Sequence, residues 1–202
     1  ALLDTAGCLN ERTVAAHGCW LSEDDCRLLG ERGVSVVHNP VSNMKLATGR
    51  AMPYHWLRDH QVNVGLGTDG CSSNNNLDML EEMKTAALCQ KFFWNSDTLL
   101  PAGEALFMAT SWGARALGYQ GGEISEGMPA DLVLISLSHP SMIPLHNPVS
   151  NIVYSAEGSA VDTVICQGRI LMHNRYIPGE EEIVTGASAS AQDLLSRAGV
   201  VA

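Results

Sequence analysis

Residues 64–70 read Val64-Gly65-Leu66-Gly67-Thr68-Asp69-Gly70, a short apolar run that ends in an aspartate set between glycines. A polar stretch follows at 71–76, and residues 77–84 then show the apolar spacing of a helix. This order predicts a strand, a loop and a helix, with Asp69 directly after the strand. In parallel α/β folds, reactive side chains lie at the carboxyl ends of the strands. Asp69 is therefore either a site residue or the cap of an ordinary βα turn.

Two similar strand segments precede this stretch. The sequence predicts strands at 13–18, 34–37 and 62–66. Helices are predicted between them, from Ser22, a suitable N-cap, to about Arg32, and over 51–59. Strand and helix thus alternate at a spacing of roughly 25–30 residues, which is typical of a parallel sheet.

Each of these strands ends at a polar side chain that can do chemistry. The three side chains are His17, His38 and Asp69. Because parallel strands end at one edge of a sheet, we expect all three to lie around one crevice. Three such residues at equivalent positions favour a site over an ordinary turn.

The alternation of strands and helices ends at about residue 120. Before this point the sequence also predicts a polar loop at 41–49 and helices at 77–94 and 102–117. After it, the sequence predicts a buried strand at 132–135 and a hairpin over 161–176 that turns at Gln167-Gly168. The tail has helical potential from about residue 189. These elements divide the chain into an α/β part (1–120), a β-rich part (121–178) and a loosely held, partly helical tail (179–202).

One hexapeptide occurs twice in the chain. Residues 38–43 (HNPVSN) recur as residues 146–151, but the flanking sequences share nothing further. The predicted surroundings also differ. We interpret the repeat as a coincidence and exclude His146 as a site residue.

Composition narrows the class of protein. The chain has 202 residues, is 46% hydrophobic and has a formal net charge of −10. This is typical of one or two globular domains, and the acidity argues against nucleic acid as a partner. We expect no membrane span and no signal peptide, because no apolar run reaches about 18 residues and the N-terminus lacks a basic segment. Six cysteines without a CxxC pattern fit free thiols in a reducing cytoplasm.

Several stretches match the pattern of a known family. They are residues 15–18 (AAHG), 38–49 (HNPVSNMKLATG), 65–70 (GLGTDG), 73–75 (SNN), 77–79 (LDM), 82–84 (EMK), 114–118 (ARALG) and 127–133 (GMPADLV). With these motifs the sequence resembles the amidohydrolase superfamily, in the branch of 5-methylthioadenosine/S-adenosylhomocysteine deaminases and chlorohydrolases. The resemblance covers about residues 10–180.

The resemblance implies a fold and a set of roles. The family fold is a metal-dependent (β/α)8 TIM-like barrel with a small β-sandwich, so residues 1–120 would supply barrel strands six to eight and residues 121–178 part of the sandwich. Asp69 would ligate a catalytic zinc, or iron, and take a proton from metal-bound water. His17 would hydrogen-bond the attacking water or the tetrahedral centre. His38 and Asn39 would either shape the site or touch substrate, and Ser73 is a further substrate-binding candidate.

The sequence also departs from the family pattern. The His-x-His pair of the first strand, the strand-five histidine and the proton-shuttling glutamate after it have no counterpart in these residues. One carboxylate cannot hold a catalytic zinc, which needs about three protein ligands. We therefore expect the chain to be the C-terminal part of a longer enzyme, inactive without the N-terminal half of the barrel.

For the complete enzyme the resemblance implies hydrolytic deamination of aminopurine nucleosides by attack of metal-bound hydroxide. The alternatives are a guanine or cytosine deaminase, an s-triazine chlorohydrolase, or a non-catalytic fragment that lacks the full metal site. The expected partners are a small-molecule substrate and the missing half of the barrel, with a homo-oligomer left open.

Overall fold

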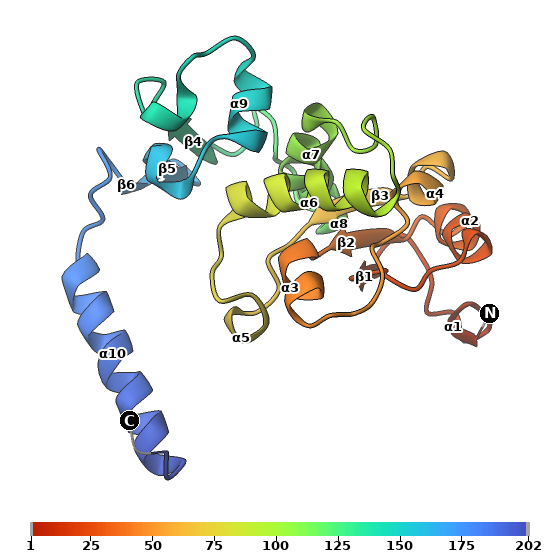
Figure 1. The fold of residues 1–202 in the computed structure, drawn as a ribbon, viewed down its shortest axis with the longest axis horizontal. Coiled ribbons are helices and arrows are strands. Elements are labelled where there is room, and N and C mark those ends of the chain that lie inside the picture. The colour runs from red at the N-terminus through yellow and green to blue at the C-terminus, as the bar shows by residue number, and fades with distance from the viewer. Residues whose placement is uncertain (1, 201–202) are drawn as a thin grey trace.

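A three-stranded parallel sheet forms the centre of the first 120 residues. The computed structural model describes residues 2–200. Strands β1 (Val14–Ala16), β2 (Ser35–His38) and β3 (Asn63–Leu66) lie side by side in that order, as Figure 1 shows. The three predicted strands and their parallel arrangement are confirmed, each within two residues of the expected bounds.

The helices between these strands begin where the sequence places capping residues. Helix α2 (Glu23–Glu31) starts with a capping box, in which the Ser22 hydroxyl accepts from the Asp25 amide and the Asp25 carboxylate accepts from the Ser22 amide. Helix α4 (Tyr54–Asp59) packs against α2. At this contact an added Cβ on Gly30 would lie 2.3 Å from the carbonyl oxygen of His60, so only glycine fits.

The predicted polar loop at 41–49 is wrong for its first half. Residues Pro40–Lys45 form helix α3, which begins directly after β2 with proline in its first turn. Proline has no amide hydrogen and its φ angle suits the first helical position, so it starts the helix readily despite the polar residues that follow. A second short helix, α5 (Cys71–Asn74), follows β3 and contacts α3.

Three further helices build the core over the sheet. Helix α6 (Met79–Phe93) is single, whereas the predicted helix 102–117 is divided into α7 (Ala102–Ala109) and α8 (Ser111–Ala116). The Thr110 hydroxyl bonds back to the carbonyl of Leu106, an interaction that bends helices. Leu57, Val64, Met83 and Met108 are among the side chains that fill the core between these helices and the sheet.

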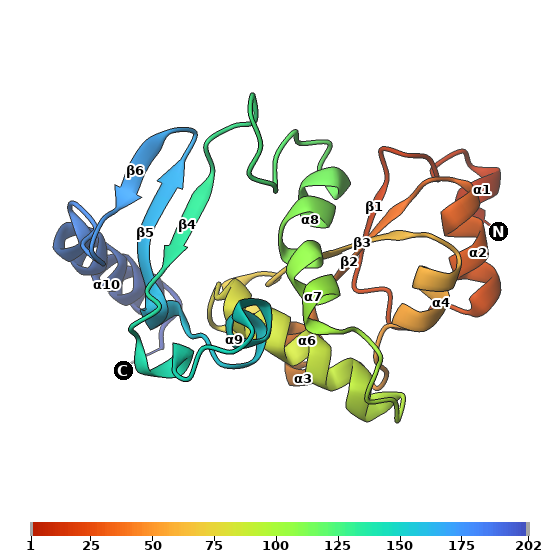
Figure 2. The same ribbon diagram turned by 90° about the horizontal axis from the view of Figure 1, so that it is seen from above.

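An antiparallel sheet forms the second part of the chain. Strands β4 (Leu132–Ile135), β5 (Val161–Cys166) and β6 (Arg169–Met172) pair in sequence order, and the predicted hairpin at Gln167-Gly168 is confirmed. The expectation that residues 132–135 are buried is wrong, because Val133 and Leu134 are about half exposed. The sheet is one layer thick, and Figure 2 shows it apart from β1–β3, with α7 and α8 in between. The short helices η1 (Pro140–Met142), α9 (Pro148–Tyr154) and η2 (Gly158–Ala160) connect β4 to β5.

The tail is more helical than predicted. Helix α10 (Glu180–Arg197) begins nine residues earlier than the expected start near 189 and includes Gly186. Three glutamates in its first turn suit the positive end of the helix dipole. No residue of α10 is buried, and Figure 1 shows the helix extending away from the rest of the chain. A short helix, α1 (Leu2–Thr5), precedes β1. Within residues 2–200, no helix is both long and apolar enough to cross a bilayer.

The two copies of the hexapeptide adopt the same local structure. In each copy the asparagine occupies the N-cap position and the proline starts the helix, α3 in one case and α9 in the other. The expectation that their contexts differ is therefore wrong for the backbone. It holds for the surroundings, because His38 is 1% exposed whereas His146 is exposed.

The close contact at Gly30 predicts a specific loss of stability. Gly30→Ala should lower the free energy of unfolding by about 1–3 kcal/mol, because the methyl group has no room. Gly103→Ala in α7 is the matched control, since an added Cβ there meets nothing within 4 Å. It should leave stability unchanged or raise it by up to about 1 kcal/mol. Urea unfolding of the purified variants measures both, and equal stabilities would contradict the packing argument.

Burial of His38 predicts that stability falls with acid. Burial lowers the pKa of His38 from 6.5 to about 3, with a smaller contribution from the charge of His17. Below pH 6.5 the unfolded chain binds a proton that the folded chain refuses, so stability decreases by up to about 1.4 kcal/mol per pH unit. His38→Gln should reduce this slope between pH 6.5 and 5, and His146→Gln should not. Urea midpoints across that range test it, and identical slopes in all three proteins would refute it.

Candidate active site

Asp69 is the carboxylate at the carboxyl end of β3. Its Oδ2 accepts hydrogen bonds from the hydroxyls of Ser42 at 2.7 Å and Ser73 at 2.8 Å. These two bonds, with smaller contributions from the backbone at Gly70 and from His17, lower the pKa of Asp69 to about 2. The side chain is exposed. Asp69 is therefore an ionised, oriented carboxylate that is open to a ligand at neutral pH.

His17 lies at the end of β1 and is held by the neighbouring strand. Its backbone amide donates to the carbonyl of Val37 at 2.8 Å. Its Nδ1 is 2.7 Å from the Oδ1 of Asn43 in α3. An amide oxygen only accepts hydrogen bonds, so the proton lies on Nδ1. In the neutral imidazole, Nε2 is then the acceptor that remains for another group.

Asn39 ties the ends of β1 and β3 together. Its Oδ1 accepts from the backbone amide of His17 at 3.3 Å, and its Nδ2 donates to the carbonyl of Gly67 at 3.0 Å. An added Cβ on Gly67 would lie 2.9 Å from that same Nδ2 and 2.9 Å from a methyl of Val37. Asn39 is 5% exposed. This geometry fits a residue that shapes the site.

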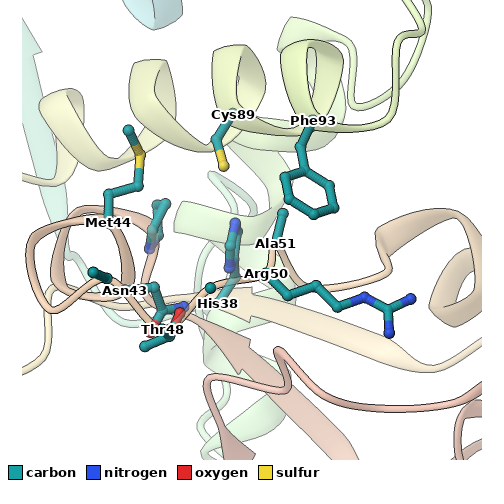
Figure 3. Close-up of a pocket in the computed structure, with 11 residues that line it drawn as sticks. His38, Asn43, Met44, Thr48, Arg50, Ala51, Cys89 and Phe93 are labelled. Carbon is teal, nitrogen blue, oxygen red and sulfur yellow. The ribbon is translucent and has the colours of Figure 1, made fainter.

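His38 lies apart from this hydrogen-bond network. Its Nε2 is 3.4 Å from the amide nitrogen of Gln90 in α6, and the ring lines a pocket of about 180 Å³. Figure 3 shows the pocket between α3 and α6, with Cys89 and Phe93 above and His38 below. Of the sequence-predicted residues, the structure thus joins His17, Asn39, Asp69 and Ser73 in neighbouring contacts and leaves His38 buried behind them.

Sequence reasoning missed the residues that support this site. Ser42 and Asn43 belong to the recognised hexapeptide but carried no assigned role, and Lys45 donates to the carbonyl of Ser72 at 3.2 Å. Glu82 was also unassigned, although it is fully buried and burial raises its pKa to about 7. The available signal for α3 was Pro40, whose place at a helix start puts Ser42 and Asn43 on the first turn beside both strand ends.

The backbone at the two principal residues is strained. His17 has φ of 67° and Asp69 has φ of 61°, both in the left-handed region that residues other than glycine rarely adopt. Strain of this kind costs on the order of 1 kcal/mol or more and gathers at functional sites, where the surroundings enforce it. Here the hydrogen bonds through Asn39 and Ser42 hold the two strand ends in place.

Known proteins and a known family match nearly the whole length of this chain. The model of the Amidohydrolase family matches residues 2–171. The chain is 84% identical, over all 202 residues, to 45% of a 5'-deoxyadenosine deaminase from Methanospirillum hungatei JF-1. It is 48% identical over 180 residues, 89% of its length, to 43% of 5-methylthioadenosine/S-adenosylhomocysteine deaminase 1 from Archaeoglobus fulgidus.

A solved structure agrees with these relatives. It is a zinc-bound adenosine deaminase from Xanthomonas campestris, 40% identical, with a TM-score of 0.91 over 99% of this chain and 45% of that one. The chain thus spans slightly less than half the length of the relatives it matches. By its sequence and its structure, this chain belongs to the amidohydrolase family.

Proposed function

We propose that the complete protein is a metal-dependent hydrolytic deaminase of aminopurine nucleosides, of the 5'-deoxyadenosine or 5-methylthioadenosine/S-adenosylhomocysteine type. The observation that carries the proposal is the ionised Asp69 carboxylate, held by two hydroxyls at the sheet edge where His17 also lies. The names of the relatives supply the substrate class. The six unpaired cysteines support a cytoplasmic location.

We further propose that this chain forms strands six to eight of a (β/α)8 barrel, followed by part of a β-sandwich. Three parallel strands cannot close a barrel. Within residues 2–200, β1 pairs on one side only, and Val14 is 42% exposed. The faces of β4 and β6 also expose apolar side chains, such as Val133 and Ile170. An N-terminal half that covers these surfaces accounts for their exposure.

Asp69 suits one position of a catalytic zinc site. Such sites commonly use about three protein ligands drawn from histidine, carboxylate and thiolate groups. The low pKa and exposure of Asp69 fit one of them. Within residues 2–200 no group of three or more His, Cys, Asp or Glu side chains is placed so that it could hold a metal ion, so the other ligands would come from outside this part of the protein. We propose zinc as the metal, with iron as the alternative.

The residues of this chain then have distinct tasks. Hydrolytic deamination adds water to the ring carbon that bears the exocyclic amine and releases that amine as ammonia. A bound divalent metal supplies the nucleophile at neutral pH by lowering the pKa of water to near 7. Asp69, as a carboxylate, takes up the proton that the water loses. His17, with its proton on Nδ1, offers Nε2 as an acceptor that orients that water. Ser73 holds Asp69 and is partly exposed, so we propose it as a substrate contact.

Two other functions are alternatives to the proposed deaminase. Other amidohydrolases, such as guanine or cytosine deaminases and s-triazine chlorohydrolases, would use the same carboxylate on a different ring. A non-catalytic protein that uses this chain as a scaffold would need neither Asp69 nor a metal.

Removal of the carboxylate tests the metal role. In the complete enzyme, Asp69→Ala should abolish ammonia release from 5'-deoxyadenosine and lower the bound zinc below one equivalent, because a ligand and proton acceptor is lost. Asp97→Ala removes an exposed carboxylate between α6 and α7 and is the control. Ammonia assays and elemental analysis give the two readouts. Full zinc content and turnover in Asp69→Ala would refute the assignment.

A substrate panel separates the proposed deaminase from its rivals. The wild-type enzyme should show its highest kcat/KM with 5'-deoxyadenosine, 5-methylthioadenosine or S-adenosylhomocysteine. Guanine, cytosine and chloro-s-triazines should be at least about tenfold poorer, since recognition groups placed for a nucleoside are left unpaired by those rings. A preference for any of these three would transfer the assignment to that rival, and no turnover with a full zinc complement would favour the scaffold.

A further inference from the structure

Glu82, in α6, is a buried carboxylate that the chemistry above does not use. Its side chain is fully buried. Oε1 accepts from the Nδ2 of Asn74 at 2.6 Å, and Oε2 accepts from the backbone amide of Val41 at 3.4 Å. Within residues 2–200 it forms no ion pair with a lysine, arginine or histidine. Burial of a carboxylate without a cation costs free energy, so the buried position of Glu82 needs an explanation beyond packing.

The bond to Asn74 extends to the loop that carries Asp69. The same Nδ2 that donates to Glu82 also donates to the carbonyl of Thr68 at 2.7 Å. Asn74 is 5% exposed, so this bridge is shielded from water. Glu82 thereby fixes two segments at once, the start of α3 through Val41 and the loop after β3 through Asn74.

The residues that Glu82 holds, directly or through Asn74, lie next in sequence to the Asp69 cluster, by which we mean Ser42, Asp69 and Ser73. The adjacent pairs are Val41 and Ser42, Thr68 and Asp69, and Asn74 and Ser73. Ser42, Asp69 and Ser73 are the three residues joined at the Asp69 Oδ2. One carboxylate therefore holds, from the protein side, all three peptide segments that set the direction of the Asp69 carboxylate.

We infer that Glu82 is a positioning residue for the proposed deamination, acting through Val41 and Asn74 on the orientation of Asp69. The inference rests on the proposed function, since it assigns Glu82 a part in that reaction. Both carboxyl oxygens of Glu82 face donors, so the arrangement needs an acceptor at each position. Glutamine offers one acceptor oxygen and turns an NH2 group toward either the Val41 amide or the Asn74 amide, so a donor would face a donor. Leucine would leave both donors without a partner.

The experiment uses the complete, zinc-loaded enzyme. Glu82→Gln should lower kcat and accelerate zinc release to a chelator, each by about 10- to 100-fold, the range for groups that orient metal ligands. KM should change by less than about threefold, since Glu82 is fully buried and has no exposed surface with which to contact a substrate. Glu81→Gln, at the neighbouring exposed position of α6, is the matched control and should match wild type.

Coupling to Ser42 separates positioning from general stability. If Glu82 acts through the Asp69 cluster, Ser42→Ala and Glu82→Gln should be non-additive, so that the double variant is little worse than the poorer single variant. A purely structural role predicts multiplied effects or an unchanged kcat with only a lower melting temperature. Either result would overturn the inference.

A second variant guards against misfolding of Glu82→Gln. Asn74→Ala cuts the bridge to Thr68 and leaves the Val41 bond intact, so it should show the same loss of kcat and faster zinc release. Asp69→Ala distinguishes the two proposals. If it keeps zinc and turnover, the proposed function fails. If it loses both while Glu82→Gln and Asn74→Ala behave like Glu81→Gln, only the inference about Glu82 fails.

Discussion

Hydrogen bonds from the first turn of α3 hold the candidate site together. Ser42 reaches Asp69 after β3, and Asn43 reaches His17 after β1. The two residues are consecutive, and side chains one position apart on a helix point about 100° away from each other. One helical turn can therefore serve both neighbouring strand ends. The imidazole and the carboxylate are thus oriented by the same short helix.

Two buried polar side chains, Glu82 and Asn74, lie between the apolar core and the candidate site. Helices α6, α7 and α8 cover the sheet with aliphatic side chains and methionines, which provide the favourable free energy of burial. Against this background Glu82 and Asn74 are desolvated at a cost, which their mutual hydrogen bond offsets only in part. The arrangement gives up some stability in order to fix the loops on the exposed side of the sheet.

The sequence was informative where the pattern is local. The strands and the residues His17 and Asp69 could be predicted, because apolar runs that end abruptly at a polar residue mark strand ends. Helix α3 was missed because its polar composition outweighed the proline at its start. Glu82 could not be assigned, since it resembles the exposed Glu81 beside it and its burial depends on contacts with Asn74 and with Val41, 41 positions away. The assigned roles of the site residues remain predictions.

The left-handed backbone at His17 and Asp69 has an evolutionary consequence. Glycine adopts this conformation without strain, so replacement by glycine at either position would relax the chain while it removes the imidazole or the carboxylate. Selection for folding alone therefore tolerates glycine at both positions, whereas selection for turnover opposes it. Gene copies that have lost their activity but still fold should accumulate glycine at these two positions, which gives a mark of functional decay that can be read directly from sequence.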